Sequence, residues 1–278
     1  MRRRVAYAPF AIAAAGAAGA GSSAWLRARE RRDGGAPVDA RLLGTVIATG
    51  CRDLALAIPL NSKQRERARA LLPAGFVLAK RATLLVETSA ADAATLDGRP
   101  IGPFRLSEAA LAIEPPRAIA SLHIPELYVE NIYMLSQLGT DPALSAFKAE
   151  AGYRSEVTEV SLELGNPARP RVAARAAAAG EIAPAAVCCV LTPGLLPAWL
   201  RVPNPGVVYK LWTCDGEGRI VVTTNTNFAI SRLAIGWGKV RVPPGTLLHG
   251  LLGGGSARGV AFSGAAQRFV NDTYVFED

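Results

Sequence analysis

The stretch YVENIYMLSQLGTDPALSAFKAEAGYRSEVTEVSLEL, residues 128–164, decides the fold of this chain. Residues 128–135 are rich in aromatic and β-branched side chains, a composition that predicts a strand. A Gly-Thr-Asp-Pro sequence then ends the strand and begins a helix. Asp141 can cap the helix N-terminus, and Pro142 fits the first helical position, where its missing N–H costs nothing.

The second half of the stretch predicts where this helix ends and where the next strand runs. Leu144, Phe147 and Ala151 form one apolar stripe at helical spacing. Gly152 suits the position after the helix, where a positive φ is needed. Apolar and polar residues then alternate over residues 157–164, which predicts a half-buried strand.

This order of strand, capped helix, Gly-aromatic turn and strand resembles the centre of the acetoacetate decarboxylase-like superfamily. The turn of that family reads Gly-aromatic-Pro-Lys-Lys, and the first of its lysines forms a Schiff base with the substrate. Here the turn reads Gly152-Tyr153-Arg154-Ser155-Glu156. The Gly-aromatic half matches, whereas Arg, Ser and Glu replace the proline and the two lysines. The resemblance implies that the scaffold is retained and that the reactive amine of the turn is lost.

Two more segments extend the resemblance over about residues 61–276. Residues 71–73 read Leu-Leu-Pro and end an early predicted helix, as a similar turn does in the family before its first strand. Residues 101–108 are similar to a family segment whose Glu points into the barrel, and Glu108 takes the place of that Glu. The resemblance implies a mainly β (α+β) fold, an antiparallel β-barrel of acetoacetate decarboxylase-like type with a few short helices.

The remaining sequence agrees with one β-rich domain over residues 35–278. It divides into about a dozen predicted strands separated by Gly/Pro turns. Residues 215–218 read Asp-Gly-Glu-Gly between two of these strands, which is a strong hairpin signal. No repeat of fixed period occurs, so a propeller or a solenoid is not expected.

Residues 1–34 differ from this domain and predict a signal or anchor segment. Arginines at residues 2–4 precede an uncharged run, residues 5–26, which is long enough to cross a membrane but consists mostly of Ala and Gly. Residues 18–20 read Ala-Gly-Ala, similar to a signal-peptidase site. Three alternatives stay open: a retained anchor, a cleaved secretory signal, and an organelle transit peptide or disordered start. The predicted location is membrane-anchored or secreted, with organelle targeting as the third alternative.

Charge and metal-binding residue types exclude several classes of function. The net charge is +8, but no basic run interleaved with aromatic residues follows residue 35, so nucleic-acid binding is not expected. The four cysteines and two histidines form no cluster with metal-ligand spacing, so no metal site and no cofactor are expected. A disulfide between Cys51 and Cys214 stays open if the protein is exported.

Imine chemistry requires a lysine that is neutral near pH 7, so burial or a neighbouring cation must lower its pKa by several units. Ser155 cannot form an imine, and Glu156 would raise the pKa of a nearby lysine. Lys148 lies outside the apolar stripe and is expected to face solvent. Lys210 lies on a predicted strand, on the same face as Trp212, where a surface position is favoured over a cavity.

The sequence thus predicts a protein of this superfamily that does not decarboxylate and that holds a small organic acid or apolar ligand. Its predicted ligand-binding residues are Glu108, Arg154, Ser155, Glu156 and Lys210, and the catalytic residues are left open. A second alternative is a lyase-type enzyme that uses Lys210 on a keto acid. A third is a membrane-tethered interaction protein without a ligand pocket. A homo-oligomer is compatible with each alternative.

Overall fold

The computed structural model describes residues 40–114, 116, 129–164, 171–176, 186–192 and 205–276. The predicted signal or anchor segment, residues 1–34, lies outside the described residues, and so does a strand predicted at residues 117–124. Among the helices that are described, none combines the length and the apolar character needed to cross a membrane.

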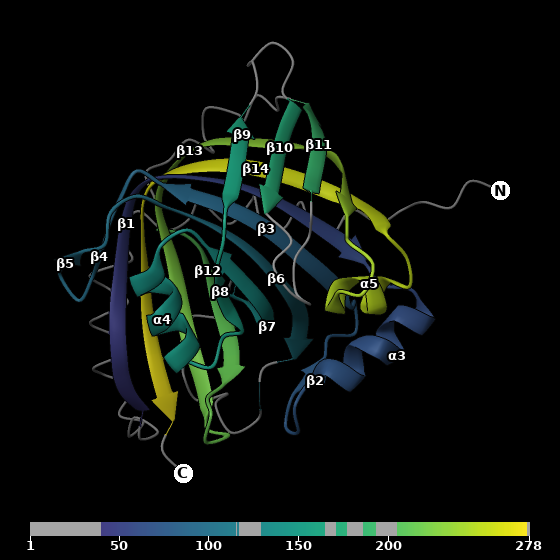
Figure 1. Ribbon diagram of the computed structural model, residues 1–278, viewed down its shortest axis with the longest axis horizontal. Coiled ribbons are helices and arrows are strands. Elements are labelled where there is room, and N and C mark those ends of the chain that lie inside the picture. The colour runs from purple at the N-terminus through teal and green to yellow at the C-terminus, as the bar shows by residue number, and fades with distance from the viewer. Residues whose placement is uncertain are drawn as a thin grey trace.

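The described part of the chain is mainly β, with three short helices (Figure 1). In chain order the elements are β1 (Ala40–Pro59), α3 (Ser62–Leu71), β2 (Val77–Leu78), β3 (Thr83–Ala91), β4 (Ala93–Leu96), β5 (Arg99–Pro100), β6 (Phe104–Glu114), β7 (Val129–Gly139), α4 (Pro142–Glu150), β8 (Ser155–Val157), β9 (Val160–Leu164), β10 (Arg171–Ala176), β11 (Ala186–Thr192), β12 (Pro205–Cys214), β13 (Ile220–Arg241), α5 (Leu247–Leu252) and β14 (Ser256–Phe276). The prediction of a mainly β chain with few helices is confirmed.

Strand pairing runs in a closed circuit. Strands β1, β3, β6, β7, β12 and β13 are neighbours in that order, and β14 pairs with both β13 and β1. Strands β11, β10 and β9 continue from the C-terminal part of β13 (Figure 1). Most pairs are antiparallel, as predicted, but β7 pairs in parallel with both β12 and β8. The prediction of antiparallel strands therefore holds only in part.

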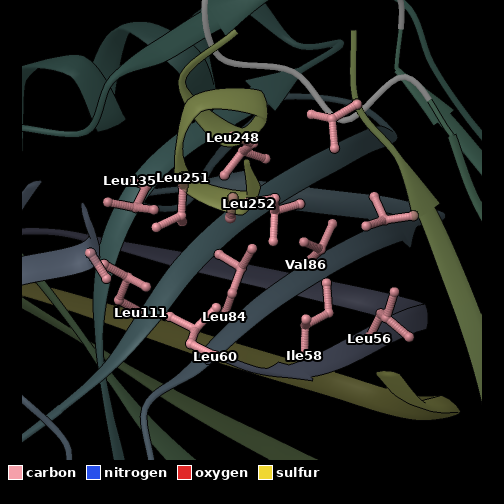
Figure 2. Packing of buried hydrophobic residues seen from close by; sticks show 14 of the residues in the cluster. Leu56, Ile58, Leu60, Leu84, Val86, Leu111, Leu135, Leu248, Leu251 and Leu252 are labelled. Carbon is pink, nitrogen blue, oxygen red and sulfur yellow. The ribbon is translucent and has the colours of Figure 1, made fainter. Parts of the chain in front are cut away.

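The outer face of this circuit carries the larger apolar core. Side chains of β1, β3 and β6 pack there under α5, and α3 contacts both α5 and β2 (Figure 2). An Asn61–Gln64 capping box begins α3, because each side chain accepts a hydrogen bond from the other residue's backbone N–H at 3.0 Å. The labelled members of this core are Leu56, Ile58, Leu60, Leu84, Val86, Leu111, Leu135, Leu248, Leu251 and Leu252.

Alternate residues of the same strands face the other way. Leu84 and Leu111 belong to the outer core, whereas Leu85 and Ala110 belong to a second cluster that also contains Tyr153. This division follows from the two-residue period of a strand, which sends successive side chains to opposite faces. We call the side that carries Leu85, Ala110 and Tyr153 the inner face, and the candidate site lies on it.

Candidate functional site

Helix α4 begins and ends where the sequence predicted. The Asp141 side chain accepts a hydrogen bond from the backbone N–H of Leu144 at 2.8 Å, and Pro142 occupies the first turn. Leu144 and Ala151 are buried as expected. The helix packs closely on β1, because a Cβ added at Gly44 would lie 2.9 Å from the Phe147 ring. A side chain at that position would push the helix away from the inner face.

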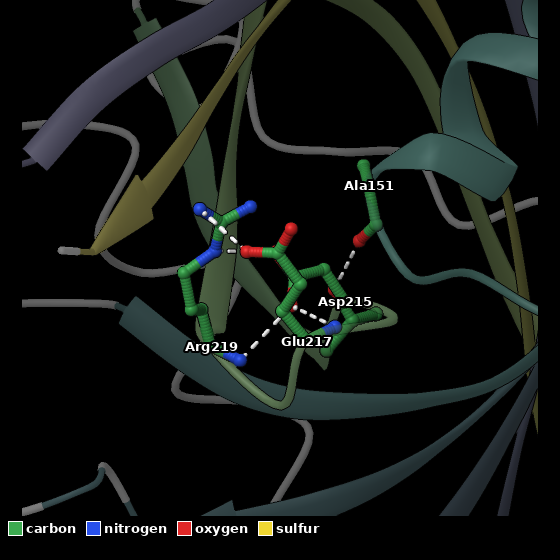
Figure 3. Close-up of polar contacts among 5 residues, drawn as sticks. Ala151, Asp215, Glu217 and Arg219 are labelled. Atoms are coloured by element: carbon green, nitrogen blue, oxygen red, sulfur yellow. Dashed lines mark hydrogen bonds and ion pairs between the residues drawn. The ribbon is translucent and has the colours of Figure 1, made fainter. Parts of the chain in front are cut away.

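The turn after α4 is fixed against the hairpin between β12 and β13. Gly152 has a φ of 82°, and an added Cβ would collide with the backbone carbonyl of Cys214. The hydroxyl of Thr213 donates a hydrogen bond of 2.7 Å to the carbonyl of Ala151. Figure 3 shows this turn beside the hairpin. The Gly-aromatic turn is therefore held against the end of β12 by two neighbouring contacts.

The hairpin itself is built around one carboxylate. Asp215 accepts hydrogen bonds from the backbone N–H groups of Glu217 and Arg219, each at 2.9 Å, and pairs with the Arg219 guanidinium at 2.8 Å (Figure 3). Partial burial alone would raise the pKa of Asp215, but these hydrogen bonds outweigh it and the pKa is lowered. The predicted Asp-Gly hairpin is confirmed, and it forms the support for the turn.

Lys148 is buried, with 2% of its surface exposed, so the expectation that it faces solvent is wrong. Its Nζ lies 4.6 Å from the centre of the Tyr153 ring and 5.8 Å from that of Phe147. Lys148 follows Leu144 by four residues, so the two share one face of α4, and the Gly152 turn folds Tyr153 back over the lysine. The buried face of α4 therefore includes Lys148 in addition to the apolar stripe that the sequence predicted.

Burial lowers the pKa of Lys148 to about 8, and the negative charge of Glu108 opposes that shift. Among the described residues, no acceptor lies within hydrogen-bonding distance of its Nζ. The ammonium form is therefore poorly solvated by the protein. A lysine with these properties has a larger neutral fraction near pH 7 than an exposed lysine, and the neutral amine is the nucleophilic form.

A row of polar side chains crosses four strands beside this lysine. Glu87 of β3 lies opposite Glu108 of β6, which lies opposite Gln137 of β7, and Gln137 pairs with Ser155 of β8. The Gln137 amide donates a hydrogen bond to the Glu108 carboxylate, and the Ser155 hydroxyl lies 3.5 Å from the Gln137 carbonyl oxygen. The row connects the Gly-aromatic turn to a pair of glutamates.

Three carboxyl groups on the inner face, Asp53, Glu87 and Glu108, hold their protons more strongly than usual. Burial is the main cause of each raised pKa. The charges of Asp53 and Glu108 raise the pKa of Glu87 further, well above its ordinary value. The Gln137 hydrogen bond and the Lys148 charge partly offset the rise at Glu108. We call these three groups the inner carboxyl cluster.

A small pocket opens at two of these carboxyl groups. Its empty volume is about 190 Å³, and this figure includes space that is open to solvent. Five of its seven lining residues are apolar. The pocket is lined by Leu85, Glu87, Glu108, Ala110, Ile132, Met134 and Leu211.

Tyr153 closes the site on the side of β13. Its hydroxyl donates a hydrogen bond of 2.8 Å to the Thr223 hydroxyl, which lies 3.0 Å from that of Thr273. Burial raises the pKa of the Tyr153 phenol, and the charge of Glu108 raises it further. Tyr153 is therefore a neutral ring fixed at both ends, with one face toward the ammonium of Lys148.

The predicted site residues do not all gather here. Glu108 lines the pocket, and Ser155 lies at the end of the polar row. Arg154 is exposed, and only its backbone carbonyl joins the row, as acceptor of a 2.9 Å hydrogen bond from the Gln137 N–H. Glu156 follows Ser155 on β8, so its side chain points to the opposite side of that short strand.

Lys210 is 8% exposed, so the expectation of a surface lysine is wrong. It does lie on the same strand face as Trp212, as predicted. Leu211 between them lines the pocket, and alternation therefore directs Lys210 and Trp212 away from it. The indole N–H of Trp212 donates a hydrogen bond of 2.9 Å to Asn131. Lys210 and Glu108 are not brought together.

The described residues also bear on the possible Cys51–Cys214 disulfide and on possible metal ligands. Cys51 and Cys214 are free thiols, so no bridge joins them. Within the described ranges no three His, Cys, Asp or Glu side chains gather in a way that could hold a metal ion.

Sequence reasoning missed Asp53, Glu87 and Gln137 as well as the burial of Lys148. For Glu87 and Gln137 the local sequence did contain a sign of a buried polar site. Glu87 follows Leu-Leu-Val in a predicted strand, and Gln137 lies in the run Met-Leu-Ser-Gln-Leu. A charged or amide side chain inside an otherwise apolar strand needs a buried polar partner or a site.

Comparisons with known proteins place this fold. No protein-family model matches the chain, and no curated protein matches it. An acetoacetate decarboxylase-like enzyme from Sphingomonas wittichii RW1 is similar in structure, with a TM-score of 0.56 and 12% identity over 83% of this chain and 90% of that one. The enduracididine biosynthesis enzyme MppR, solved in complex with pyruvate, has a TM-score of 0.53 and 13% identity over 84% of this chain and 91% of that one.

Acetoacetate decarboxylase from Legionella pneumophila has a TM-score of 0.50 and 13% identity, over 84% of this chain and 88% of its own. These identities are too low to carry an activity from one protein to another. They agree with the resemblance that the central turn indicated. The chain has the fold of the acetoacetate decarboxylase-like superfamily.

Proposed function

We propose that this chain binds a small carbonyl compound inside a closed β-barrel through a reversible imine at Lys148. The observation that carries the proposal is the environment of that lysine. It is 2% exposed, lies against the rings of Phe147 and Tyr153, and has no hydrogen-bond acceptor among the described residues. A solvated surface ammonium has none of these three properties.

The proposed reaction is the addition of a neutral amine to a carbonyl group. The Nζ of Lys148 forms a bond to the carbonyl carbon, and the carbonyl oxygen takes up protons and leaves as water. The product is a protonated imine, which carries the same charge as the ammonium. The Tyr153 ring, 4.6 Å from Nζ, stabilises that charge through its electron-rich face. Hydrolysis reverses the reaction without any further reagent.

Glu108 has the proton-transfer role in this proposal. Its pKa is raised by burial, so its carboxyl group holds a proton more strongly than an ordinary glutamate does. It can give that proton to the departing oxygen and take it back during hydrolysis. The hydrogen bond from Gln137 holds the carboxyl group in place. Gln137 is therefore a positioning residue, and Glu108 is the group that acts.

A second candidate function is noncovalent binding of an apolar ligand. The apolar lining of the pocket favours it. Lys148 and Glu108 would then be two buried groups of opposite charge that contribute to the fold without reacting, which the test below has to distinguish. The lyase alternative at Lys210 has less support, because that side chain points away from the pocket. The membrane-tethered alternative stays a prediction, since it rests on residues 1–34.

Borohydride reduction separates the two candidates. The full chain is incubated with butanone at pH 7.5, reduced, digested and mapped by mass spectrometry. We expect Lys148 to be labelled at least about tenfold faster than Lys63 and Lys80, which are both exposed and serve as internal references. The Lys148→Met variant should lose only that label. Labelling of Lys148 no faster than the exposed lysines would leave the noncovalent candidate as the better one.

A further inference from the structure

The charges around Lys148 are unusual for a site that would hold an organic acid. The inner carboxyl cluster places Asp53, Glu87 and Glu108 on the same face as the lysine. Only Lys148 and Lys210 are buried among the lysines and arginines whose side chains are described, and Lys210 is directed to the other face. Among the buried cations of the described residues, the one on the inner face is thus the proposed nucleophile itself.

We infer that this site takes small aldehydes and ketones that carry no carboxylate, and that Glu87 excludes keto acids from it. The inference rests on the proposed imine at Lys148 and names the substrate class of that same site. It departs from the organic acid that the sequence suggested. It agrees with the second part of that prediction, an apolar ligand.

Geometry gives the first reason. In a 2-oxo or 3-oxo acid the carboxylate is one or two bonds from the carbonyl carbon. Once that carbon is bonded to Nζ, the carboxylate must lie within a few ångströms of the nitrogen. Glu108 is the carboxyl group whose charge acts on Lys148, and Glu87 lies directly opposite Glu108 across the sheet. A keto acid would therefore place a third carboxylate beside this pair.

The second reason is that no described cation is available to pair with a bound carboxylate. A bound carboxylate is usually held by an arginine fork, a lysine or a helix N-terminus. Arg154, the cation of the predicted turn, is exposed, and only its backbone carbonyl reaches the polar row. When Lys148 has become an imine it keeps its single positive charge, which Glu108 already offsets. No second cation is described on this face to balance the acid.

The pocket lining gives the third reason. Leu85, Ala110, Ile132, Met134 and Leu211 surround the two glutamates with aliphatic surface. Alkyl groups of a short ketone or aldehyde can displace water from that surface, whereas an anion would lose its hydration there without compensation.

The test compares two compounds of equal size. Acetoacetate and acetoacetamide differ only in that an amide replaces the carboxylate. Each compound is incubated with the full chain, reduced with borohydride, and its labelled lysines are mapped by mass spectrometry. Labelling of Lys148 is then divided by labelling of the exposed Lys63, which corrects for the intrinsic reactivity of each compound with an amine. We expect this ratio to be at least about tenfold higher for acetoacetamide, because like charges at close range in a partly buried site repel strongly.

The Glu87→Gln variant tests whether Glu87 is the residue that excludes keto acids. It leaves Lys148 and Glu108 in place. The variant should bring the acetoacetate ratio closer to the acetoacetamide ratio measured on the same variant. Glu114→Gln is the matched control, because Glu114 is an exposed glutamate on the same strand as Glu108. It should change neither ratio.

The outcomes of this test are distinct. Labelling of Lys148 by acetoacetate as strong as by acetoacetamide in the wild type would overturn the inference and leave the proposed imine intact. An unchanged acetoacetate ratio in a folded Glu87→Gln variant would overturn the role of Glu87. Absence of label at Lys148 with both compounds would refute the proposed function, and the inference with it. The wild-type comparison stands even if the variant does not fold.

Discussion

Glu87 of β3 and Glu108 of β6 lie directly opposite each other in an antiparallel pair, and both line the same small pocket. Two like charges in this position destabilise a sheet. Neither group has an arginine beside it among the described contacts, and the charge that acts on Glu108 is that of Lys148. Such an arrangement costs stability, so its presence points to a site rather than to the core.

The first prediction concerns Glu87. Its pKa is raised by burial and by the charges of Asp53 and Glu108. A carboxyl group whose pKa is higher in the folded state destabilises the protein as pH rises from its unfolded pKa toward its folded one. We expect Glu87→Gln to match the wild type near pH 4 and to be more stable at pH 7, on the order of 1 kcal/mol. Urea midpoints at the two pH values measure this, and a variant less stable at pH 7 than at pH 4, relative to wild type, would contradict it.

The second prediction concerns Lys148. Its pKa falls from 10.5 to about 8 on folding, chiefly through burial. The unfolded chain therefore binds more protons between pH 8 and pH 10, so this lysine makes the protein more stable as pH rises through that window. Lys148→Met should lack this gain. The difference in unfolding free energy between wild type and variant should shift by about 2 kcal/mol from pH 8 to pH 10.

The same comparison cancels the tyrosines and thiols that titrate at high pH, because both proteins contain them. A difference that stays constant from pH 8 to pH 10 would mean that Lys148 is solvated like a surface lysine.

The third prediction tests the support of the turn. Gly152→Ala puts a Cβ against the Cys214 carbonyl at a φ of 82°, so we expect a loss of about 2–4 kcal/mol. Gly216→Ala in the adjacent hairpin is the control, since nothing lies within 4 Å of its added Cβ. It should cost less than about 1 kcal/mol. Equal losses in urea unfolding would show that the turn is not held in the described way.

The fourth prediction uses the end of the polar row. The sequence resemblance aligns Ser155 with the reactive lysine of the family, and the Ser155 hydroxyl lies 3.5 Å from the Gln137 carbonyl oxygen. In a Ser155→Lys, Lys148→Met double variant, the new amine should be labelled by butanone and borohydride above the level of exposed lysines. Glu156→Lys with Lys148→Met is the matched control, because residue 156 points to the other side of β8. Label at 156 but not at 155 would reverse the assignment of the inner face.

The local parts of the fold were predictable from the sequence. Asp141 caps α4, Gly152 ends it and the Asp-Gly hairpin forms, because each depends on residues close in the chain. The place of Glu108 on the inner face also follows from its strand and from the resemblance. These features need no knowledge of which distant strands pair.

The inner face depends on contacts that are distant in sequence. Lys148 is buried beside the Tyr153 ring, and the charge of Glu108 from another strand reaches it there, although its helix position looks exposed by itself. Glu87 became a candidate only when β3 paired with β6 in a register that sets it against Glu108. Periodicity gives the face of one strand but not the partner that covers it.

The central claim is that Lys148 forms an imine with a neutral carbonyl compound, and carbon NMR observes this bond without a reductant. Butanone labelled with ¹³C at its carbonyl carbon is added to the full chain and to Lys148→Met at pH 8. We expect a new resonance in the imine region for the wild type and none for the variant. Either no imine resonance in the folded wild type, or one of equal intensity in Lys148→Met, would show that Lys148 does not form the imine.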